Sequence, residues 1–437
     1  MLNFDRALTL LKEFIRINTS NPPGNEEEAI LFLDAILHKE GIPAEIFSPT
    51  PRRANILATM KGKRRGKPIV LLGHVDTVPA REDDWEVDPF GGEIKDGFIY
   101  GRGTIDMKSQ VICQLLSFIH LYKHGVTPEQ DIVFLATCDE EVGGEYGVKY
   151  VIDKVPELKD ASFVLSEGGC ITDEGGLLHA QISVDEKKLS QFMIVARGTG
   201  GHGSLPHKDN ANEKIVTASN AILSYNWPFI PTRVVTAYLN GILKGKRGNG
   251  FVYTTLHEAL KKKAFRNYVQ RNPVYNALLR NTVTLTILKG GEKVNVIPTE
   301  SHATFDARLL PAQRHEDFFR IIKKLCRNQI ELRPINDNTN IPQSPQSPYK
   351  TRYFKTISKV VKAFKGQIPV LPFLTTGATD LRYFRNLGIV SYGFFPVTLP
   401  KEESLRMHGV NERISIENLK EGLEGTYRVV ESFASFI

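Results

Sequence analysis

Histidine and acidic side chains follow several short apolar stretches of the sequence, at the point where each stretch ends. They are His74 and Asp76 after the stretch 68–72, Glu140 and Glu141 after 132–136, and Glu167 after 163–165. Such stretches predict buried strands, and the carboxyl ends of parallel strands meet at one edge of an open α/β sheet, where ligands bind. Carboxylates gathered that closely repel one another unless a cation lies among them. The spacing therefore predicts a metal centre at this edge.

A further acid, Asp106, lies in the segment GRGTIDMK (101–108), just before an amphipathic stretch that predicts a helix over about 107–124. Two glycines free the backbone of this segment, and the helix would fix the carboxylate. Asp106 is therefore the best candidate to bridge two cations, which lie about 3.5 to 4 Å apart in two-metal hydrolases. His74 could bind one of them, and Asp76 could accept the second ring N–H of His74.

Glu140 and Glu141 are adjacent, so their side chains point in different directions and serve different purposes. One of the two can bind a cation while the other faces the substrate as a base. A single HxD or EE pair is common in proteins without metal; the agreement of independent strand ends favours the metal interpretation. The segment GGHGS (200–204) lacks the lysine of a P-loop and does not match GxGxxG, which argues against a phosphate-binding loop.

Length and composition indicate a globular protein with two domains. The 437 residues exceed what one hydrophobic core usually supports, and 41% hydrophobic and 24% charged residues are ordinary values. No apolar run approaches the ~18 residues of a membrane helix, and charges interrupt the N-terminal helix, so we expect a cytoplasmic protein without a membrane partner. The four cysteines form no CxxC pair, which predicts reduced thiols.

The formal net charge of +7 arises in one segment, 244–271, where eight cations accompany the single acid Glu258. The segment carries no nucleic-acid-binding motif. A solvated helical face or a dimer contact is therefore expected there rather than a nucleic-acid site.

The order of the predicted elements indicates how the chain is divided. Alternating strands and helices extend to about residue 185. A β-α-β-β-α-β order then follows, typical of a small ferredoxin-like domain, interrupted by a helical and basic insertion at about 227–280. A connector rich in Pro, Asn, Ser and Gln (334–348) leads back to the first domain, which closes with a helix over about 416–434.

Five motifs, in this order, resemble those of one family of dinuclear metallopeptidases, M20. They are GHVDTVP (73–79), GRGTIDMK (101–108), CDEEVGG (138–144), SEGG (166–169) and MHGVNE (407–412). The family includes glutamate carboxypeptidase-type enzymes, succinyl-diaminopimelate desuccinylase, acetylornithine deacetylase and aminoacylase. The resemblance implies that the metal ligands are His74, Asp106 as the bridge, Glu141, Glu167 and His408. It also implies that Asp76 orients His74, that Glu140 is the general acid/base, and that the two cations are zinc, with cobalt or manganese as substitutes.

The resemblance also implies an architecture. The expected fold class is α/β: a catalytic domain of 1–185 and 341–437, with a mixed sheet flanked by helices, interrupted by a ferredoxin-like α+β lid domain of 186–340. In this family the lid commonly carries the interface of a homodimer. The residues similar to substrate-binding positions of the family are His202, Asn295, Arg308 and Gly377.

The expected reaction is hydrolysis of an amide bond by metal-activated water, with a free carboxylate of the substrate held by Arg308. N-acyl amino acid deacylase and carboxypeptidase or dipeptidase remain open; Glu167 slightly disfavours an aminopeptidase, because relatives of that type tend to carry aspartate there. A non-catalytic metal-binding homologue is the alternative from another class. It is disfavoured because all five ligand positions and the base are present.

Overall fold

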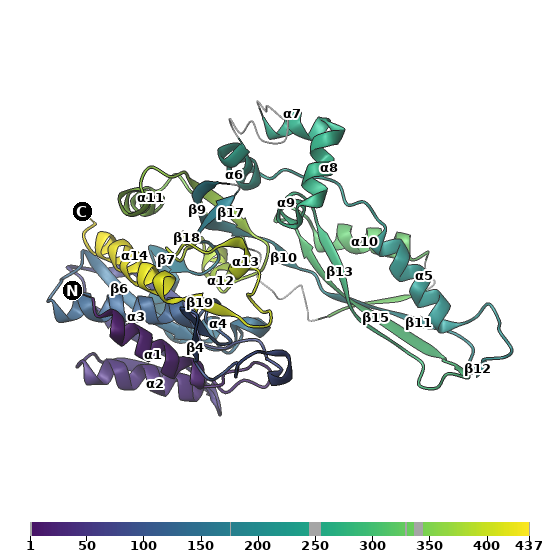
Figure 1. Ribbon diagram of the computed structural model, residues 1–437, viewed down its shortest axis with the longest axis horizontal. Coiled ribbons are helices and arrows are strands. Elements are labelled where there is room, and N and C mark those ends of the chain that lie inside the picture. Colours follow the sequence, from purple (N-terminus) through teal and green to yellow (C-terminus); the bar gives the residue numbers. More distant parts are fainter. Residues whose placement is uncertain (1, 175, 244–254, 328–329, 336–343, 437) are drawn as a thin grey trace. The chain divides into compact units, whose positions relative to one another are not determined.

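The computed structural model describes residues 2–174, 176–243, 255–327, 330–335 and 344–436 (Figure 1). The chain divides into two compact units. Unit 1 comprises Met1–Val184, Pro345–Phe373 and Thr379–Ile437, and unit 2 comprises Asp185–Ser344 and Leu374–Ala378. The assignment of 1–185 and 341–437 as a catalytic domain and of 186–340 as a lid stays a prediction.

Unit 1 is built on a mixed nine-stranded sheet with the order β1-β2-β6-β3-β7-β18-β9-β17, in which β8 pairs with β9. Its strands are β1 (Ala44–Thr50), β2 (Arg53–Met60), β3 (Arg64–His74), β6 (Gln130–Thr137), β7 (Phe163–Ser166), β8 (Ile171–Glu174), β9 (Leu177–Glu186), β17 (Val370–Thr375) and β18 (Ser391–Gly393). The strand β3 is parallel to β6 and to β7, and β7 is parallel to β18. Four neighbouring strands, β6, β3, β7 and β18, therefore end at the same edge of the sheet.

Helices flank this sheet (Figure 1). They are α1 (Phe4–Arg16), α2 (Glu27–Lys39), α3 (Lys108–Lys123), α4 (Val148–Lys154), α11 (Arg352–Lys365), α12 (Leu381–Asn386), α13 (Lys401–Ser404) and α14 (Ile416–Ala434). Short 3-10 turns lie at η1 (Glu82–Asp84), η2 (Glu140–Val142) and η3 (Pro156–Asp160), and a small sheet joins β4 (Ile94–Lys95), β5 (Phe98–Tyr100) and β19 (Arg413–Ser415).

The alternation of side chains along β3 explains how helices cover both faces of the sheet. Val70 and Leu72 share an apolar cluster with residues of α4 and α12. On the opposite face, a Cβ atom at Gly73 would lie only 2.7 Å from Cγ2 of Val111 in α3. Glycine at this position therefore allows α3 to approach the end of β3.

Unit 2 has the β-α-β-β-α-β order expected of a ferredoxin-like domain, and the predicted fold class is confirmed. Its strands are β10 (Lys188–Leu189), β11 (Phe192–Arg197), β12 (Gly201–His202), β13 (Thr282–Gly290), β14 (Val296–Ile297), β15 (Glu300–Leu309) and β16 (Glu331–Pro334). In the main sheet β13 pairs with β15, β15 with β11, and β11 with β16, all antiparallel. The two helices of the β-α-β-β-α-β order are α5 (Ala211–Leu223) and α10 (His315–Leu325).

The insertion at 227–280 is helical where the structure describes it. Its helices are α6 (Arg233–Leu243), α7 (Leu256–Lys261), α8 (Lys263–Arg271) and α9 (Pro273–Leu279). Apolar side chains such as Phe265 and Val269 are buried, whereas Lys261, Lys262 and Lys263 are exposed. The basic residues at 244–247 lie outside the described residues.

Candidate metal centre

The three parallel strands β3, β6 and β7 deliver the predicted residues to one edge of the unit 1 sheet. His74 is the last residue of β3, the loop with Glu140 and Glu141 follows β6, and Glu167 follows β7. Asp106 precedes α3, and His408 lies between α13 and β19. Residues more than 300 positions apart in the chain are thus brought to a single place.

Asp106 occupies the centre of this cluster, with one imidazole on each of its carboxylate oxygens. Nε2 of His74 lies 2.9 Å from Oδ1 of Asp106, and Nε2 of His408 lies 3.0 Å from Oδ2. The oxygen of Glu167 nearest to Nε2 of His74 lies at 3.7 Å, and that of Glu141 nearest to Nε2 of His408 lies at 3.3 Å. Two groups with ligand atoms within 4.8 Å of one another result: His74, Asp106 and Glu167, and Asp106, Glu141 and His408.

The electrostatics of the cluster fit a pair of cations. Burial raises the pKa of Glu167 well above its ordinary value, and the charges of Asp106 and Glu141 raise it further. Hydrogen bonds with Asp106 and Glu141 raise the pKa of His408 to about 10. A carboxyl or imidazole group must lose its proton before it binds a metal ion. Divalent cations would then supply the positive charge that the protons on Glu167 and His408 otherwise provide. Imidazole and carboxylate donors at this spacing therefore suit two divalent ions.

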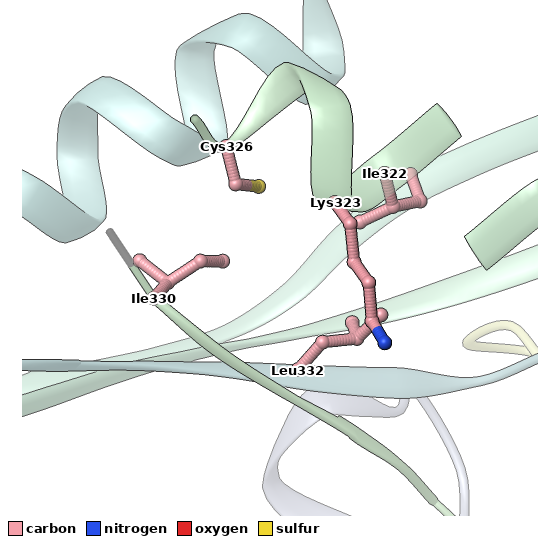
Figure 2. Close-up of a pocket in the computed structure, with 5 residues that line it drawn as sticks. All are labelled: Ile322, Lys323, Cys326, Ile330 and Leu332. Atoms are coloured by element: carbon pink, nitrogen blue, oxygen red, sulfur yellow. The ribbon is translucent and has the colours of Figure 1, made fainter. Parts of the chain in front are cut away.

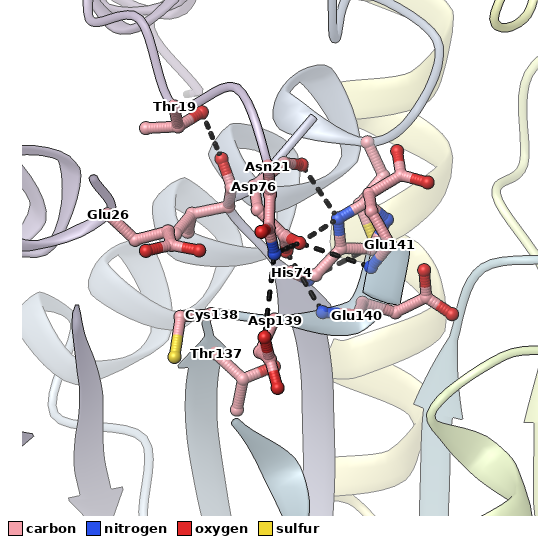
Figure 3. A network of polar contacts seen from close by, with 12 residues as sticks. Thr19, Asn21, Glu26, His74, Asp76, Thr137, Cys138, Asp139, Glu140 and Glu141 are labelled. Carbon is pink, nitrogen blue, oxygen red and sulfur yellow. Dashed lines mark hydrogen bonds and ion pairs between the residues drawn. The ribbon is translucent and has the colours of Figure 1, made fainter. Parts of the chain in front are cut away.

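The buried carboxylate of Asp76 holds the backbone that carries the two glutamates (Figure 3). Its Oδ1 accepts a hydrogen bond from the N–H of Glu140, and its Oδ2 accepts from the N–H of Glu141, both at 3.1 Å. The side-chain amide of Asn21 donates to Oδ2 at 2.9 Å. Asp76 thus fixes the turn η2 on which Glu140 and Glu141 lie.

Two oxygens of Asp76, one from its backbone and one from its carboxylate, lie near the ring of His74. Nδ1 of His74 lies 3.0 Å from the backbone oxygen of Asp76 and 3.5 Å from its carboxylate oxygen Oδ1. The carboxylate also accepts hydrogen bonds from the two backbone N–H groups of the loop after β6. A sequence pattern cannot distinguish these two acceptors because they belong to the same residue.

Glu140, the expected general acid/base, is partly buried. Burial raises its pKa well above the ordinary value, and the charge of Glu167 raises it further. A carboxyl group with a raised pKa holds a proton more readily than an ordinary glutamate.

Several residues around the cluster were not found by the motif argument. Asp139, just before Glu140, accepts hydrogen bonds from Arg53 and from the N–H of Tyr146. Asp380 is buried, and burial raises its pKa to about 7. Glu412 is buried and accepts from the N–H of Ile105 at 2.7 Å. Glu412 is the last residue of the motif MHGVNE, and Asp139 is the second residue of the motif CDEEVGG. Their places in these motifs are the sequence signal that could have identified them.

The residues expected to bind substrate lie in unit 2. His202 is exposed, and its Nδ1 lies 2.7 Å from the hydroxyl of Ser204. The strands β12 and β14 bring the loops of His202 and Asn295 together, since the N–H of Gly203 donates to the oxygen of Asn295. Arg308 forms a two-pronged ion pair with Asp306, at 2.7 and 3.0 Å.

Gly377, the fourth of the expected substrate-binding residues, lies in the segment Leu374–Ala378 of unit 2. A Cβ atom there would meet only Cγ2 of Thr375, at 4.0 Å.

A separate pocket of about 320 Å³ lies in unit 2 between α10 and β16 (Figure 2). It is lined by Ile322, Lys323, Cys326, Ile330 and Leu332. Burial raises the pKa of the Cys326 thiol to about 11, which leaves it protonated and unreactive at neutral pH. None of the residues expected to bind metal or substrate lines this pocket.

Comparison with known proteins assigns the family. The model of peptidase family M20/M25/M40 matches residues 70–432, a range that contains all five expected ligands. The chain belongs to this family. Membership in peptidase family M20/M25/M40 makes it a hydrolase of amide bonds, as the motifs predicted.

Two proteins of known sequence and one solved structure are similar to this M20 chain. It is 32% identical to the N-fatty-acyl-amino acid synthase/hydrolase PM20D1 of Xenopus tropicalis over 365 residues, which cover 81% of this chain and 70% of that protein. It is 26% identical to aminoacylase-1 of Mus musculus, over 98% of this chain and 95% of the relative. The fold resembles that of the M20 metallo-carboxypeptidase Sso-CP2 of Sulfolobus solfataricus, with a TM-score of 0.74, 18% identity, and coverage of 98% and 99%.

Among the helices that the structure describes, none combines the length and apolar content needed to cross a bilayer. The cytoplasmic location expected from the sequence stays a prediction.

Proposed function

We propose that this M20 hydrolase binds two divalent cations, zinc with cobalt or manganese as substitutes, and cleaves the amide bond of small N-acyl amino acids or peptides that carry a free carboxylate. The observation that carries the proposal is the position of Asp106. Because its two oxygens face different imidazoles, one carboxylate can be shared by two cations. His74 and Glu167 would complete one site, and Glu141 and His408 the other.

The proposed chemistry assigns one proton-transfer residue. Two bound cations would lower the pKa of a water molecule and polarise the carbonyl of the substrate. Glu140 takes a proton from the attacking water and gives it to the departing nitrogen. Its raised pKa supports this role, because the group can hold the proton between the two transfers. Asp76 keeps Glu140 and Glu141 in place through their backbone N–H groups.

We assign substrate recognition to the four residues of unit 2. Arg308 would bind the free carboxylate, for which its ion pair with Asp306 provides a model, since a guanidinium binds carboxylates in the same two-pronged manner. His202 is exposed and can donate a hydrogen bond to a developing oxyanion. Asn295 and Gly377 are proposed to contact the substrate.

The relatives favour an acyl amino acid over a peptide. PM20D1 and aminoacylase-1 are named for N-acyl amino acid chemistry, and both cover most of this chain. Carboxypeptidase or dipeptidase activity is the second candidate, supported by the relative named probable carboxypeptidase S-like 2 of Dictyostelium discoideum, at 28% identity. An aminopeptidase and a non-catalytic homologue are the remaining alternatives.

A homodimer through unit 2 is also part of the proposal. The strand β13 lies at the edge of its sheet, with Ile287 and Leu288 about half exposed, at 47% and 54%. Val216 and Leu223 of α5 are similarly exposed. Edge strands with exposed apolar side chains tend to pair with a second chain.

The experiment that tests the function uses zinc-loaded protein and a panel of N-acyl amino acids of increasing acyl length, together with dipeptides. We expect turnover of the acyl amino acids, and we expect Glu140→Ala to retain two equivalents of zinc while losing nearly all turnover. A Glu140→Ala protein with the parental rate would refute the assignment of the base. Bound zinc without turnover across the panel would favour the non-catalytic alternative.

A further inference from the structure

A buried ion pair joins the two loops that carry Asp106 and His408. The side chains of Arg102 and Glu412 are 4% and 0% exposed, and Nη1 of Arg102 lies 2.7 Å from Oε2 of Glu412. Neither residue belongs to the groups of expected metal ligands. Because a buried ion pair loses hydration on both partners, it stabilises a fold little more than apolar packing would, and its presence here calls for another explanation.

The contacts of this pair lead directly to the two ligand loops. Oε1 of Glu412 accepts hydrogen bonds from the N–H groups of Ile105 and Asp106, at 2.7 and 3.3 Å. Nη2 of Arg102 donates to the backbone oxygen of His408 at 3.3 Å. The carboxylate therefore holds the backbone of Asp106, and the guanidinium holds the backbone of His408.

The backbone of His408 needs such support. Its φ angle is 61°, in the left-handed region that non-glycine residues seldom adopt. Conformations of this kind persist when surrounding contacts determine them, and they are common at binding sites. The hydrogen bond from Arg102 is one such contact, and it acts on the residue whose imidazole faces Asp106 and Glu141.

We propose that Arg102 and Glu412 are positioning residues that set the distance between Asp106 and His408, and thereby the affinity of the protein for its two cations. This inference rests on the two-cation function proposed above. The two residues act unequally. Glu412 supports Asp106, the ligand shared by both cations, whereas Arg102 supports His408, a ligand of one cation only.

This asymmetry predicts different metal-binding behaviour for two conservative variants. Arg102→Lys keeps a positive charge beside Glu412, but a single ammonium cannot reproduce the fork that reaches both Glu412 and the oxygen of His408. Loss of an outer contact to a ligand typically weakens metal binding about 10- to 100-fold. We expect one equivalent of zinc to bind with parental affinity and the second to bind 10- to 100-fold more weakly. Glu412→Asp shortens the carboxylate, and we expect both equivalents to weaken.

The test is a titration of the metal-free full-length protein with Zn²⁺ in competition with a chromophoric chelator. Matched controls are Arg385→Lys and Glu421→Asp. Arg385 is buried in unit 1 and donates to the oxygen of Ser391, and Glu421 pairs with Lys365 at 2.6 Å. Neither is one of the expected ligands, so both controls should bind two equivalents with parental affinity.

The outcomes separate this inference from the function on which it rests. Parental protein that binds fewer than two equivalents would overturn the two-cation function itself. Parental protein that binds two, together with variants that bind both with parental affinity, would overturn only the positioning role. Equal weakening of both equivalents in Arg102→Lys would refute the asymmetry. If Arg102→Lys and Glu412→Asp both fail to fold without metal while the controls fold, as measured by circular dichroism, the pair serves stability and the inference is wrong.

Discussion

Replacing Asp76 by asparagine tests whether the turn with Glu140 and Glu141 must be held for catalysis. In the parental protein, the two carboxylate oxygens accept three hydrogen bonds, from the N–H of Glu140, the N–H of Glu141 and the side chain of Asn21. Asparagine has one oxygen instead of two. If that oxygen takes the position of Oδ2, its NH₂ group faces the N–H of Glu140, and two donors meet.

The size of the effect follows from these contacts. At least one of the three hydrogen bonds is lost, and the group left behind is removed from water because Asp76 is 0% exposed. A hydrogen bond to a charged group contributes about 1.5–3 kcal/mol. A loss of about 2–3 kcal/mol lowers the fraction of protein with the turn correctly placed about 30- to 150-fold. We expect kcat/KM to fall by that factor.

The assay is kcat/KM of the zinc-loaded protein on the best N-acyl amino acid of the panel, with folding checked by circular dichroism. Asp131→Asn is the matched control, because Asp131 also accepts a backbone N–H, from Gly62 at 2.8 Å, but lies at the opposite end of β6. A folded Asp76→Asn protein with kcat/KM within about threefold of the parent would show that the turn is held by other contacts, and the reasoning would be refuted.

Three further predictions concern stability and metal. Removal of the cations by a chelator should lower the melting temperature in differential scanning fluorimetry, and added Zn²⁺ should restore it, because an ion at 100 times its Kd stabilises the folded state by about 2.7 kcal/mol per site. Burial raises the pKa of Glu26 from 4.5 to about 7, so the folded state holds this proton more tightly than the unfolded state and loses stability as the pH rises from 4.5 to 7. Glu26→Gln should remove this loss, ~3 kcal/mol, when urea unfolding of the metal-free protein at pH 8 is compared with that at pH 5; equal pH dependence in parent and variant would contradict this. A Cβ atom at position 393 would lie 1.7 Å from the backbone oxygen of Glu167, so Gly393→Ala should cost about 1–3 kcal/mol of stability and weaken zinc binding; an unchanged melting temperature and zinc affinity would count against it.

Local patterns in the sequence were sufficient to predict the strands and the helix that carry the residues of the metal centre. The apolar stretches before His74, Glu140 and Glu167 are the strands β3, β6 and β7, and the stretch after Asp106 is the helix α3. These predictions succeeded because strand and helix periodicity are properties of neighbouring residues. The helix was expected to be amphipathic, but it is buried on almost all sides, polar residues included. The strand β17 (Val370–Thr375) and the helix α12 (Leu381–Asn386) were not predicted, since both are short and their residues are ordered mainly by packing against distant parts of the sheet.

The ferredoxin-like order of unit 2 was also readable from the sequence, although the insertion separates its α5 from its β13 by almost sixty residues. The pairing of β13 with β15 and of β11 with β16 depends on long-range contacts. The pattern indicated which segments would be strands, but not which of them pair.

The sequence by itself determined the residue types of a metal centre and the strand ends that carry them, because ligand chemistry and local periodicity are both written in neighbouring residues. Only the tertiary structure decided that the two oxygens of Asp106 face different imidazoles, that Asp76 holds backbone N–H groups more than the ring of His74, and that Arg102 and Glu412 join two ligand loops. These contacts link residues up to 310 positions apart, and their geometry depends on how the whole sheet and its helices pack.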